Sequence, residues 1–101
     1  MQPTHKLLSA TPHVVNISMP TAFTEYSYTL PSHTRKFTIK LRESNILTMA
    51  FTEGASGTTY LTIPSGTSYW DSELYTTDHN IVTVYFQSPA AAQTAEIVYW
   101  N

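Results

Sequence analysis

The sequence predicts an all-β fold, a single antiparallel β-sandwich or jelly roll of about seven or eight short strands. Apolar and polar residues alternate with a period of two along several short runs, and turn-forming residues separate these runs at the spacing typical of sandwiches. Seven Tyr, four Phe and two Trp, together with many Thr and Ser residues, favour pleated surfaces. No connection is long enough for repeated crossover helices, which excludes a parallel α/β fold.

The chain has 101 residues and no cysteine, so we expect one domain without disulfides, thiol nucleophiles or thiolate ligands. Its stability must come from packing within the domain or against partner subunits. No apolar run approaches the length of a membrane span, and the N-terminal residues lack the sustained apolar segment of a signal peptide. The sequence therefore predicts no membrane association.

Residues 1–21 are predicted to form an extended arm that precedes a sandwich domain at residues 22–101. Three prolines exclude a long helix from this region: Pro3, Pro12 and Pro20. Its apolar residues are Val14, Val15 and Ile17. The segment 13–18 could add to a sheet edge in its own subunit or in a neighbour, and a frayed terminus is the alternative.

The first two strands of the sandwich are predicted at residues 22–30 and 36–42. In the first, alternation places Tyr26, Tyr28 and Leu30 on one side. The sequence Pro-Ser-His-Thr at residues 31–34 then favours a turn, because proline presets its own backbone angle. In the second strand the apolar side carries Phe37, Ile39 and Leu41, and the other side carries Thr38, Lys40 and Arg42. This strand and the two that follow it are expected to form the centre of the sheet.

Two further strands are predicted at residues 47–52 and 58–63. Leu47, Met49 and Phe51 alternate with Thr48, Ala50 and Thr52 in the first of these. Thr59, Leu61 and Ile63 alternate with Thr58, Tyr60 and Thr62 in the second. Between them Gly54 and Gly57 allow a reversal with positive φ. The short polar connection at residues 43–45 predicts that the strands at 36–42 and 47–52 are antiparallel neighbours.

The last three strands are predicted at residues 68–70, 81–87 and 95–100. The first is short and leads into an acidic loop at residues 71–78. In the second, Val84 and Phe86 share a face with Val82, and in the third Ala95, Ile97 and Tyr99 share a face. Burial of Phe37, Ile39, Val84 and Phe86 is expected to be essential for folding.

Four of the five basic residues lie close together, although the formal net charge is only −2. They are Arg35, Lys36, Lys40 and Arg42. Such a strip could contact phosphate or an acidic partner, but its alternation with apolar residues favours a solvated strand face that prevents edge-to-edge pairing. This pattern does not favour nucleic acid as a partner.

The sequence predicts no catalytic residue, no metal site and no cofactor. The four histidines, His5, His13, His33 and His79, lack the spacing of metal ligands. Neither a nucleophile elbow nor a phosphate-binding loop is present in the sequence. Isolated turn or surface histidines are the favoured interpretation, and we expect the protein not to be an enzyme.

Acidic residues in or beside predicted loops are the candidates for a catalytic or calcium-binding site. They are Glu53, Asp71, Glu73 and Asp78. Glu53 with Asp71 or Glu73 could form the carboxylate pair of a glycoside hydrolase, and the four could also ligate calcium through oxygen. Short loops leave little material for a substrate cleft, so solvated turn acids are favoured over both.

Three aromatic residues lie beside these acids: Tyr69, Trp70 and Tyr75. The candidate interface consists of these three residues and the apolar residues of the arm, Val14, Val15 and Ile17. Aromatic residues in a polar loop can cover the end of a sandwich, form a contact between subunits, or stack on sugars. The sequence leaves these three alternatives open.

Several phrases together resemble a group of small β-sandwich structural proteins of tailed bacteriophage virions. The phrases are Tyr-Thr-Leu-Pro at 28–31, Lys-Phe-Thr-Ile-Lys-Leu-Arg at 36–42, Gly-Thr-Thr-Tyr-Leu-Thr-Ile-Pro-Ser-Gly at 57–66, Val-Tyr-Phe-Gln-Ser at 84–88 and Glu-Ile-Val-Tyr-Trp at 96–100. They span residues 22–100 and leave the first twenty residues outside the match. The similarity is one of strand patterns, and no catalytic motif accompanies it.

This resemblance implies a non-enzymatic virion component, most plausibly a capsid decoration or cement protein that stabilises the phage head. A head–tail accessory protein is a nearby possibility, and a carbohydrate- or receptor-binding module of a phage tail or head fibre is the alternative. The implied partners are the major capsid protein or other virion proteins and further copies of the chain itself. The implied location is the virion, assembled in the cytoplasm of a bacterial host.

Overall fold

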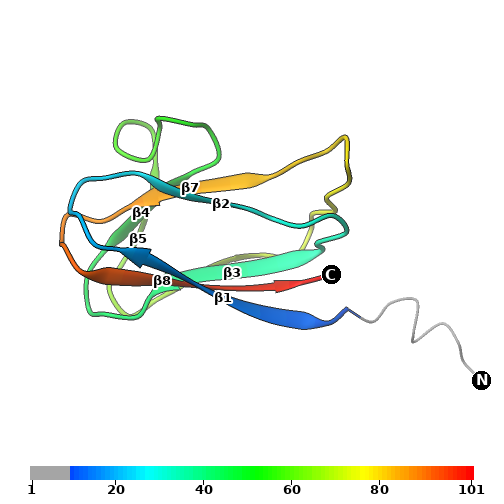
Figure 1. The fold of residues 1–101 in the computed structure, drawn as a ribbon, viewed down its shortest axis with the longest axis horizontal. Helices are drawn as coiled ribbons and strands as arrows, with labels where there is room; N and C mark the ends of the chain where they lie inside the picture. The colour runs from blue at the N-terminus through cyan, green and yellow to red at the C-terminus, as the bar shows by residue number, and fades with distance from the viewer. Residues whose placement is uncertain (1–9) are drawn as a thin grey trace, which may run out of the picture.

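The computed structural model describes residues 10–101, which contain eight β-strands and no helix (Figure 1). The strands are β1 (Pro12–Met19), β2 (Tyr26–Thr29), β3 (Lys36–Leu41), β4 (Leu47–Ala50), β5 (Leu61–Ile63), β6 (Tyr69–Asp71), β7 (Thr83–Gln87) and β8 (Gln93–Trp100). The predicted all-β fold is confirmed. No described helix is long and apolar enough to cross a bilayer.

Two four-stranded antiparallel sheets form the sandwich. Sheet A has the strand order β1-β8-β3-β6 and sheet B the order β2-β7-β4-β5. In Figure 1, β1, β8 and β3 lie in the lower layer, and β2, β7 and β4 lie in the upper layer. The chain passes from one sheet to the other at every step except β4 to β5, and the resulting strand order is that of an eight-stranded jelly roll. The prediction that the strands at 36–42, 47–52 and 58–63 form the centre of one sheet was therefore wrong: β3 lies in sheet A, whereas β4 and β5 lie in sheet B, and β5 is an edge strand.

The core lies between the two sheets, and the residues that the alternating pattern of β3 and β7 predicts to face inward are the buried ones. Phe37, Ile39 and Leu41 of β3 are buried against Val84 and Phe86 of β7 and neighbouring apolar side chains. In the described residues, every buried side-chain nitrogen or oxygen has a hydrogen-bond partner. The interior is therefore apolar, and its few buried polar side chains are satisfied.

Strand β1 forms one edge of sheet A, so the segment 13–18 adds to a sheet edge in its own subunit, which is one of the arrangements that the sequence left open. Residues 12–19 are extended, as expected, and they pair with β8 of the same chain along their whole length, from Pro12 opposite Trp100 to Met19 opposite Gln93. Val15 and Ile17 pack against the core and Met19 is fully buried. Both flanking prolines are tolerated because they stand at or beyond the strand ends. Residues 1–9 lie outside the described part of the chain.

The loop between β4 and β5 explains why these two strands are shorter than predicted. It folds over the outer side of β4, where the hydroxyl of Thr48 donates to the carbonyl oxygen of Ser56 at 2.7 Å. Thr48 and Ala50, expected on a polar face, are consequently buried, while Phe51 lies beyond the strand and is 50% exposed. Gly54 has the expected positive φ of 84°, but Gly57 does not. A side chain at Gly57 would meet the amide of Gln87 at 3.1 Å.

Candidate functional site

The three aromatic residues of the predicted interface do not form one cluster. Successive residues of a strand face opposite sides of a sheet, so Tyr69 and Asp71 of β6 face the core and Trp70 faces outward. The ring of Tyr69 packs 5.8 Å from that of Phe37 and 6.3 Å from that of Phe51, measured between centroids. Burial, with a smaller contribution from the charge of Asp71, raises the pKa of Tyr69. Tyr69 therefore packs against the core, and its phenol stays neutral near neutral pH.

Trp70 lies on the outer face of sheet A with two partners that sequence reasoning did not assign. It is 60% exposed and stands opposite Thr38 of β3. The ammonium nitrogen of Lys36 lies 5.9 Å from the centroid of the Trp70 ring and 4.7 Å from that of Trp100. Cation–π contacts at exposed sites contribute about 0.5–1 kcal/mol each. The two indoles thus flank one lysine on the outer face of sheet A.

This aromatic surface continues across the sheet to β1. The register places Val14 opposite Val98, and Val98 opposite Thr38, in one row with Trp70. Val14 is 69% exposed. We call the surface formed by Val14, Lys36, Trp70, Val98 and Trp100 the Trp70–Trp100 face. Of the predicted interface residues, Val14 and Trp70 belong to it, whereas Val15 and Ile17 pack inward.

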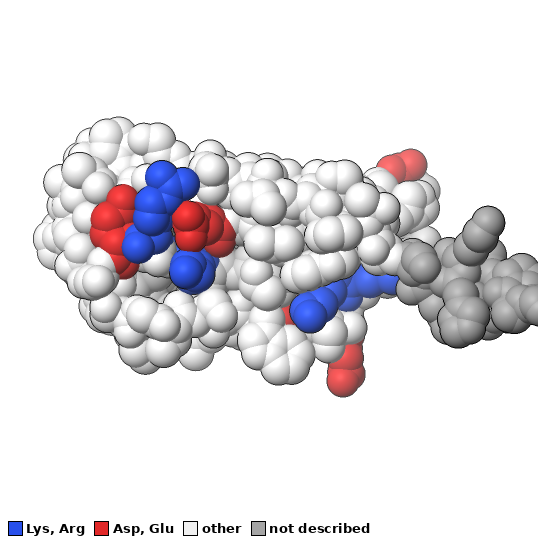
Figure 2. Space-filling model, turned by 90° about the horizontal axis from the view of Figure 1, so that it is seen from below, with Lys and Arg blue, Asp and Glu red and all other residues white. Residues whose placement is uncertain are grey.

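Charged residues gather at one end of the same sheet, where Figure 2 shows basic and acidic side chains side by side. Glu96 accepts a hydrogen bond from Nε of Arg42 at 2.9 Å and lies 3.7 Å from the ammonium of Lys40. Lys36 contacts the two indoles instead. Lys36, Lys40 and Arg42 therefore have partners on the sheet itself, which supports the interpretation of a solvated strand face.

Tyr75 lies at another place, in the loop between β6 and β7. Its hydroxyl is 2.8 Å from Nδ1 of His33, and the hydroxyl of Ser32 donates to Asp78 at 2.8 Å. The backbone N–H of His33 donates to the carbonyl oxygen of Thr76, and the N–H of Thr76 donates to the carbonyl oxygen of Thr34, which joins the same two loops. These contacts hold the β2–β3 loop against the β6–β7 loop, and Tyr75, which is 49% exposed, is part of this junction.

A second exposed apolar surface lies on the outer side of sheet B. Phe23, Ile46 and Tyr60 are exposed there and line a depression of about 200 Å³ whose floor includes Thr48 and Gln87. Phe23 is 71% exposed and has a φ of 54°, which is unusual for a bulky residue. We call this the Phe23 surface. It lies on the side of the sandwich opposite the Trp70–Trp100 face.

The histidines and acids form no recognisable reactive centre in the described residues. Within residues 10–101 no three His, Asp or Glu side chains are placed to hold a metal ion. His13 stacks on Tyr99 with ring centroids 4.9 Å apart. Glu53, Glu73 and Asp78 are exposed in loops, and Asp71 is half-buried. His5 lies outside the described residues.

Comparisons with known proteins bear on the fold only. No known protein family matches the chain. No curated protein matches it either. Among solved structures, the chain is similar to a de novo designed double-stranded β-helix determined by solution NMR, with a TM-score of 0.53 and 12% sequence identity, over 90% of this chain and 99% of the designed one. At this identity the likeness supports the architecture and says nothing of function.

Proposed function

We propose that the protein is a non-enzymatic structural subunit that assembles with copies of itself and with other proteins of a phage virion, as a capsid decoration or cement protein. The observation that carries the proposal is the pair of exposed apolar surfaces on opposite outer faces of one small sandwich. These are the Trp70–Trp100 face on sheet A and the Phe23 surface on sheet B.

Exposed large apolar side chains that gather on one surface are typical of protein interfaces, and Trp is enriched among the residues that dominate binding energy. Two different surfaces on opposite sides of a molecule allow heterologous contacts, in which one copy contacts its neighbours through unlike faces. Repeated copies on a symmetric shell then gain strength from many modest contacts. A small cysteine-free jelly roll suits this role.

The virion context rests on the resemblance of the strand phrases at residues 22–100 and on an analogy of fold. Jelly rolls occur in viral capsid and lectin domains, among other proteins. The expected partners are the major capsid protein or other virion proteins and further copies of this chain. The expected location is the assembled particle.

Two measurements test this proposal. Analytical ultracentrifugation of the purified chain should show concentration-dependent association that Trp70→Ala or Phe23→Ala weakens. The melting temperature of Trp70→Ala should fall by no more than about 8 °C, which the loss of one exposed cation–π contact accounts for. Glu53→Ala, which changes an exposed loop residue outside both surfaces, is the control. Mass spectrometry of particles from the phage that encodes the chain should detect it in stoichiometric amounts. A monomer at all concentrations that is absent from particles would contradict the proposal.

A carbohydrate-binding module is the second candidate, and one observation favours it. The exposed indole of Trp70 and the partly buried indole of Trp100 lie on either side of Lys36, whose ammonium group can donate hydrogen bonds. A glycan array should then show binding that disappears in both Trp70→Ala and Trp100→Ala. Binding that survives both substitutions would remove this candidate.

A further inference from the structure

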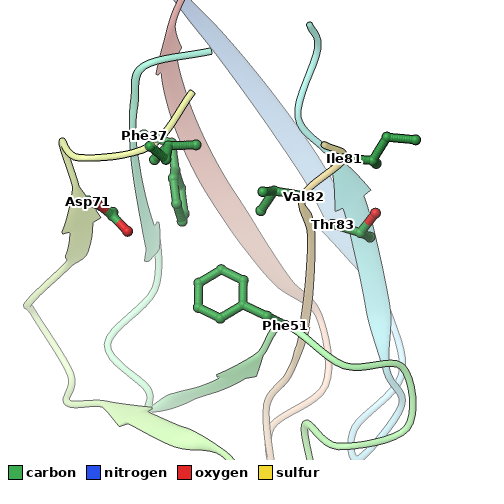
Figure 3. A pocket seen from close by; sticks show the side chains of 7 residues that line it. Phe37, Phe51, Asp71, Ile81, Val82 and Thr83 are labelled. Carbon is green, nitrogen blue, oxygen red and sulfur yellow. The ribbon is translucent and has the colours of Figure 1, made fainter. Parts of the chain in front are cut away.

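A cavity of about 290 Å³ opens between the two sheets beside edge strand β6, away from both surfaces described above. Its lining is mostly apolar and consists of Phe37, Phe51, Asp71, Leu74, Ile81, Val82 and Thr83 (Figure 3). The volume is at the lower end of the range found for small-molecule sites, which are typically apolar with a few well-placed polar groups. The cavity is therefore large enough for one small organic molecule.

The carboxylate of Asp71 is the charged group of this cavity. Asp71 stands opposite the fully buried Phe37, so it lies on the core side of sheet A, and Figure 3 shows its side chain pointing into the space between Phe37 and Phe51. Oδ1 accepts the backbone N–H of Glu73 at 2.8 Å. No residue from 10 to 101 donates a hydrogen bond to Oδ2, and no lining residue carries a positive charge.

Aromatic rings complete the environment of this carboxylate. The rings of Phe37 and Phe51 meet edge to face, with centroids 6.4 Å apart and planes at 88°. Tyr69 packs against both rings. Aromatic faces attract cations through their quadrupole, and the free oxygen of Asp71 can accept a charge-assisted hydrogen bond from an ammonium group. The charge, the rings and the volume thus complement one chemical class, an ammonium group on an apolar body.

We propose that the cavity beside β6 binds a small organic amine, with its ammonium group on the free oxygen of Asp71 and its apolar body against Phe37, Phe51 and Leu74. The site does not depend on the proposed assembly role, because it shares no residue with the Trp70–Trp100 face or the Phe23 surface. An inward-pointing charge on an edge strand can also act only to prevent edge-to-edge pairing. The experiment below separates these two roles.

The test compares three probes that share one apolar body: 2-phenylethylamine, which is protonated at neutral pH, the neutral 2-phenylethanol, and the anionic 3-phenylpropionate. Each is titrated into the full chain and followed by amide and methyl NMR shifts. We expect the amine to shift Leu74, Val82 and Thr83 and to bind about tenfold or more tightly than the alcohol, since hydrogen bonds to charged groups exceed neutral ones. The propionate should not bind.

Asp71→Asn removes the charge and keeps an oxygen that can accept the N–H of Glu73. In this variant the affinity for the amine should fall to that for the alcohol, and the affinity for the alcohol should not change. Glu73→Gln is the matched control, because Glu73 is exposed and does not line the cavity; it should leave amine binding intact.

Equal affinity of the wild-type protein for the amine and the alcohol would overturn the proposal, and this comparison needs no variant. Shifts confined to residues outside the cavity would overturn it as well. An Asp71→Asn variant that binds the amine unchanged and self-associates more strongly would assign Asp71 to edge protection instead.

Discussion

Replacing Glu25 with Ala tests how the long β4–β5 loop is held against the sandwich. One carboxylate oxygen of Glu25 accepts the N–H of Gly54 at 2.8 Å. The other accepts the N–H of Ser56 at 3.1 Å and a short hydrogen bond from the hydroxyl of Ser56. Ser56 is fully buried, and its carbonyl oxygen accepts the hydroxyl of Thr48. The carboxylate therefore fixes the segment that covers β4.

The loss of stability in Glu25→Ala depends on which of the former hydrogen-bond donors water can reach after the substitution. Gly54 is exposed, so water replaces its lost partner at little cost, whereas the buried groups of Ser56 lose a charged acceptor. Hydrogen bonds to charged groups contribute about 1.5–3 kcal/mol each, and an unsatisfied buried donor costs a similar amount. We expect Glu25→Ala to lower the free energy of unfolding by about 2–3 kcal/mol, or the melting temperature by about 10–15 °C for a domain of this size.

The stabilisation by Glu25 should decrease as the pH falls. Burial alone would raise the pKa of Glu25, but the hydrogen bonds from the hydroxyl of Ser56 and from the backbone of Gly54 and Ser56 together hold it below its ordinary value of 4.5. A carboxyl whose pKa is lowered by folding stabilises the fold fully above its unfolded pKa, and this contribution is lost as the pH falls through the folded pKa. The wild-type protein should therefore approach the variant in acid.

Thermal unfolding followed by circular dichroism from neutral pH to about pH 3 measures both effects. The difference between the wild-type protein and Glu25→Ala should be constant above about pH 5 and should narrow below it. Glu53→Ala, an exposed acid of the same loop, should change stability by less than about 0.5 kcal/mol. Equal melting temperatures at neutral pH, or a difference that does not respond to acid, would refute the reasoning.

Three further predictions concern the core, one turn and one partly buried tyrosine pair. Val84→Asp places an unpaired charge at a fully buried position and should give insoluble protein on expression; a soluble variant that melts cooperatively would contradict the parity of β7. Gly66→Ala should lower the free energy of unfolding, measured with urea, by about 1–2 kcal/mol, because φ is 80° and alanine disfavours this conformation. No clash adds to this cost, since nothing lies within 4 Å of the added methyl group. Burial, and then the neighbouring Tyr99, raise the pKa of Tyr28, so the stability this pair contributes should be complete below about pH 10 and lost at higher pH. Tyr99→Phe should weaken that loss, and an unchanged alkaline profile would argue against the coupling.

The core could be predicted from the sequence because parity along a strand is a local property. Phe37 and Ile39 alternate with polar residues, and so do Val84 and Phe86, so each strand indicates its buried side without reference to any other. Turn residues then bound the strands, and their spacing indicates a sandwich. The prediction was weakest where a loop covers a strand, because Thr48 is buried by residues 51–60 and nothing in its own strand shows this.

Strand β1 shows a second limit of local reasoning. Pro12 and Pro20 suggested an arm, but both stand where β1 loses nothing by lacking an N–H donor. Val15, Ile17 and Met19 alternate with polar or exposed residues, which is the same evidence that identified the other strands. The pairing partner, β8, lies at the far end of the sequence, so only the fold could show that β1 completes sheet A.

The candidate sites could not be predicted as groups, because each joins residues that only strand register brings together. Lys36, Trp70 and Trp100 come from β3, β6 and β8, and a shift of one residue in either pairing would separate them. Adjacent residues of a strand face opposite sides of the sheet. Trp70 therefore faces outward beside Lys36, while Asp71 faces the cavity beside Phe37. Adjacent residues thus belong to different surfaces. The assembly test at Trp70 and the amine test at Asp71 are therefore independent, although a single peptide bond joins the two residues.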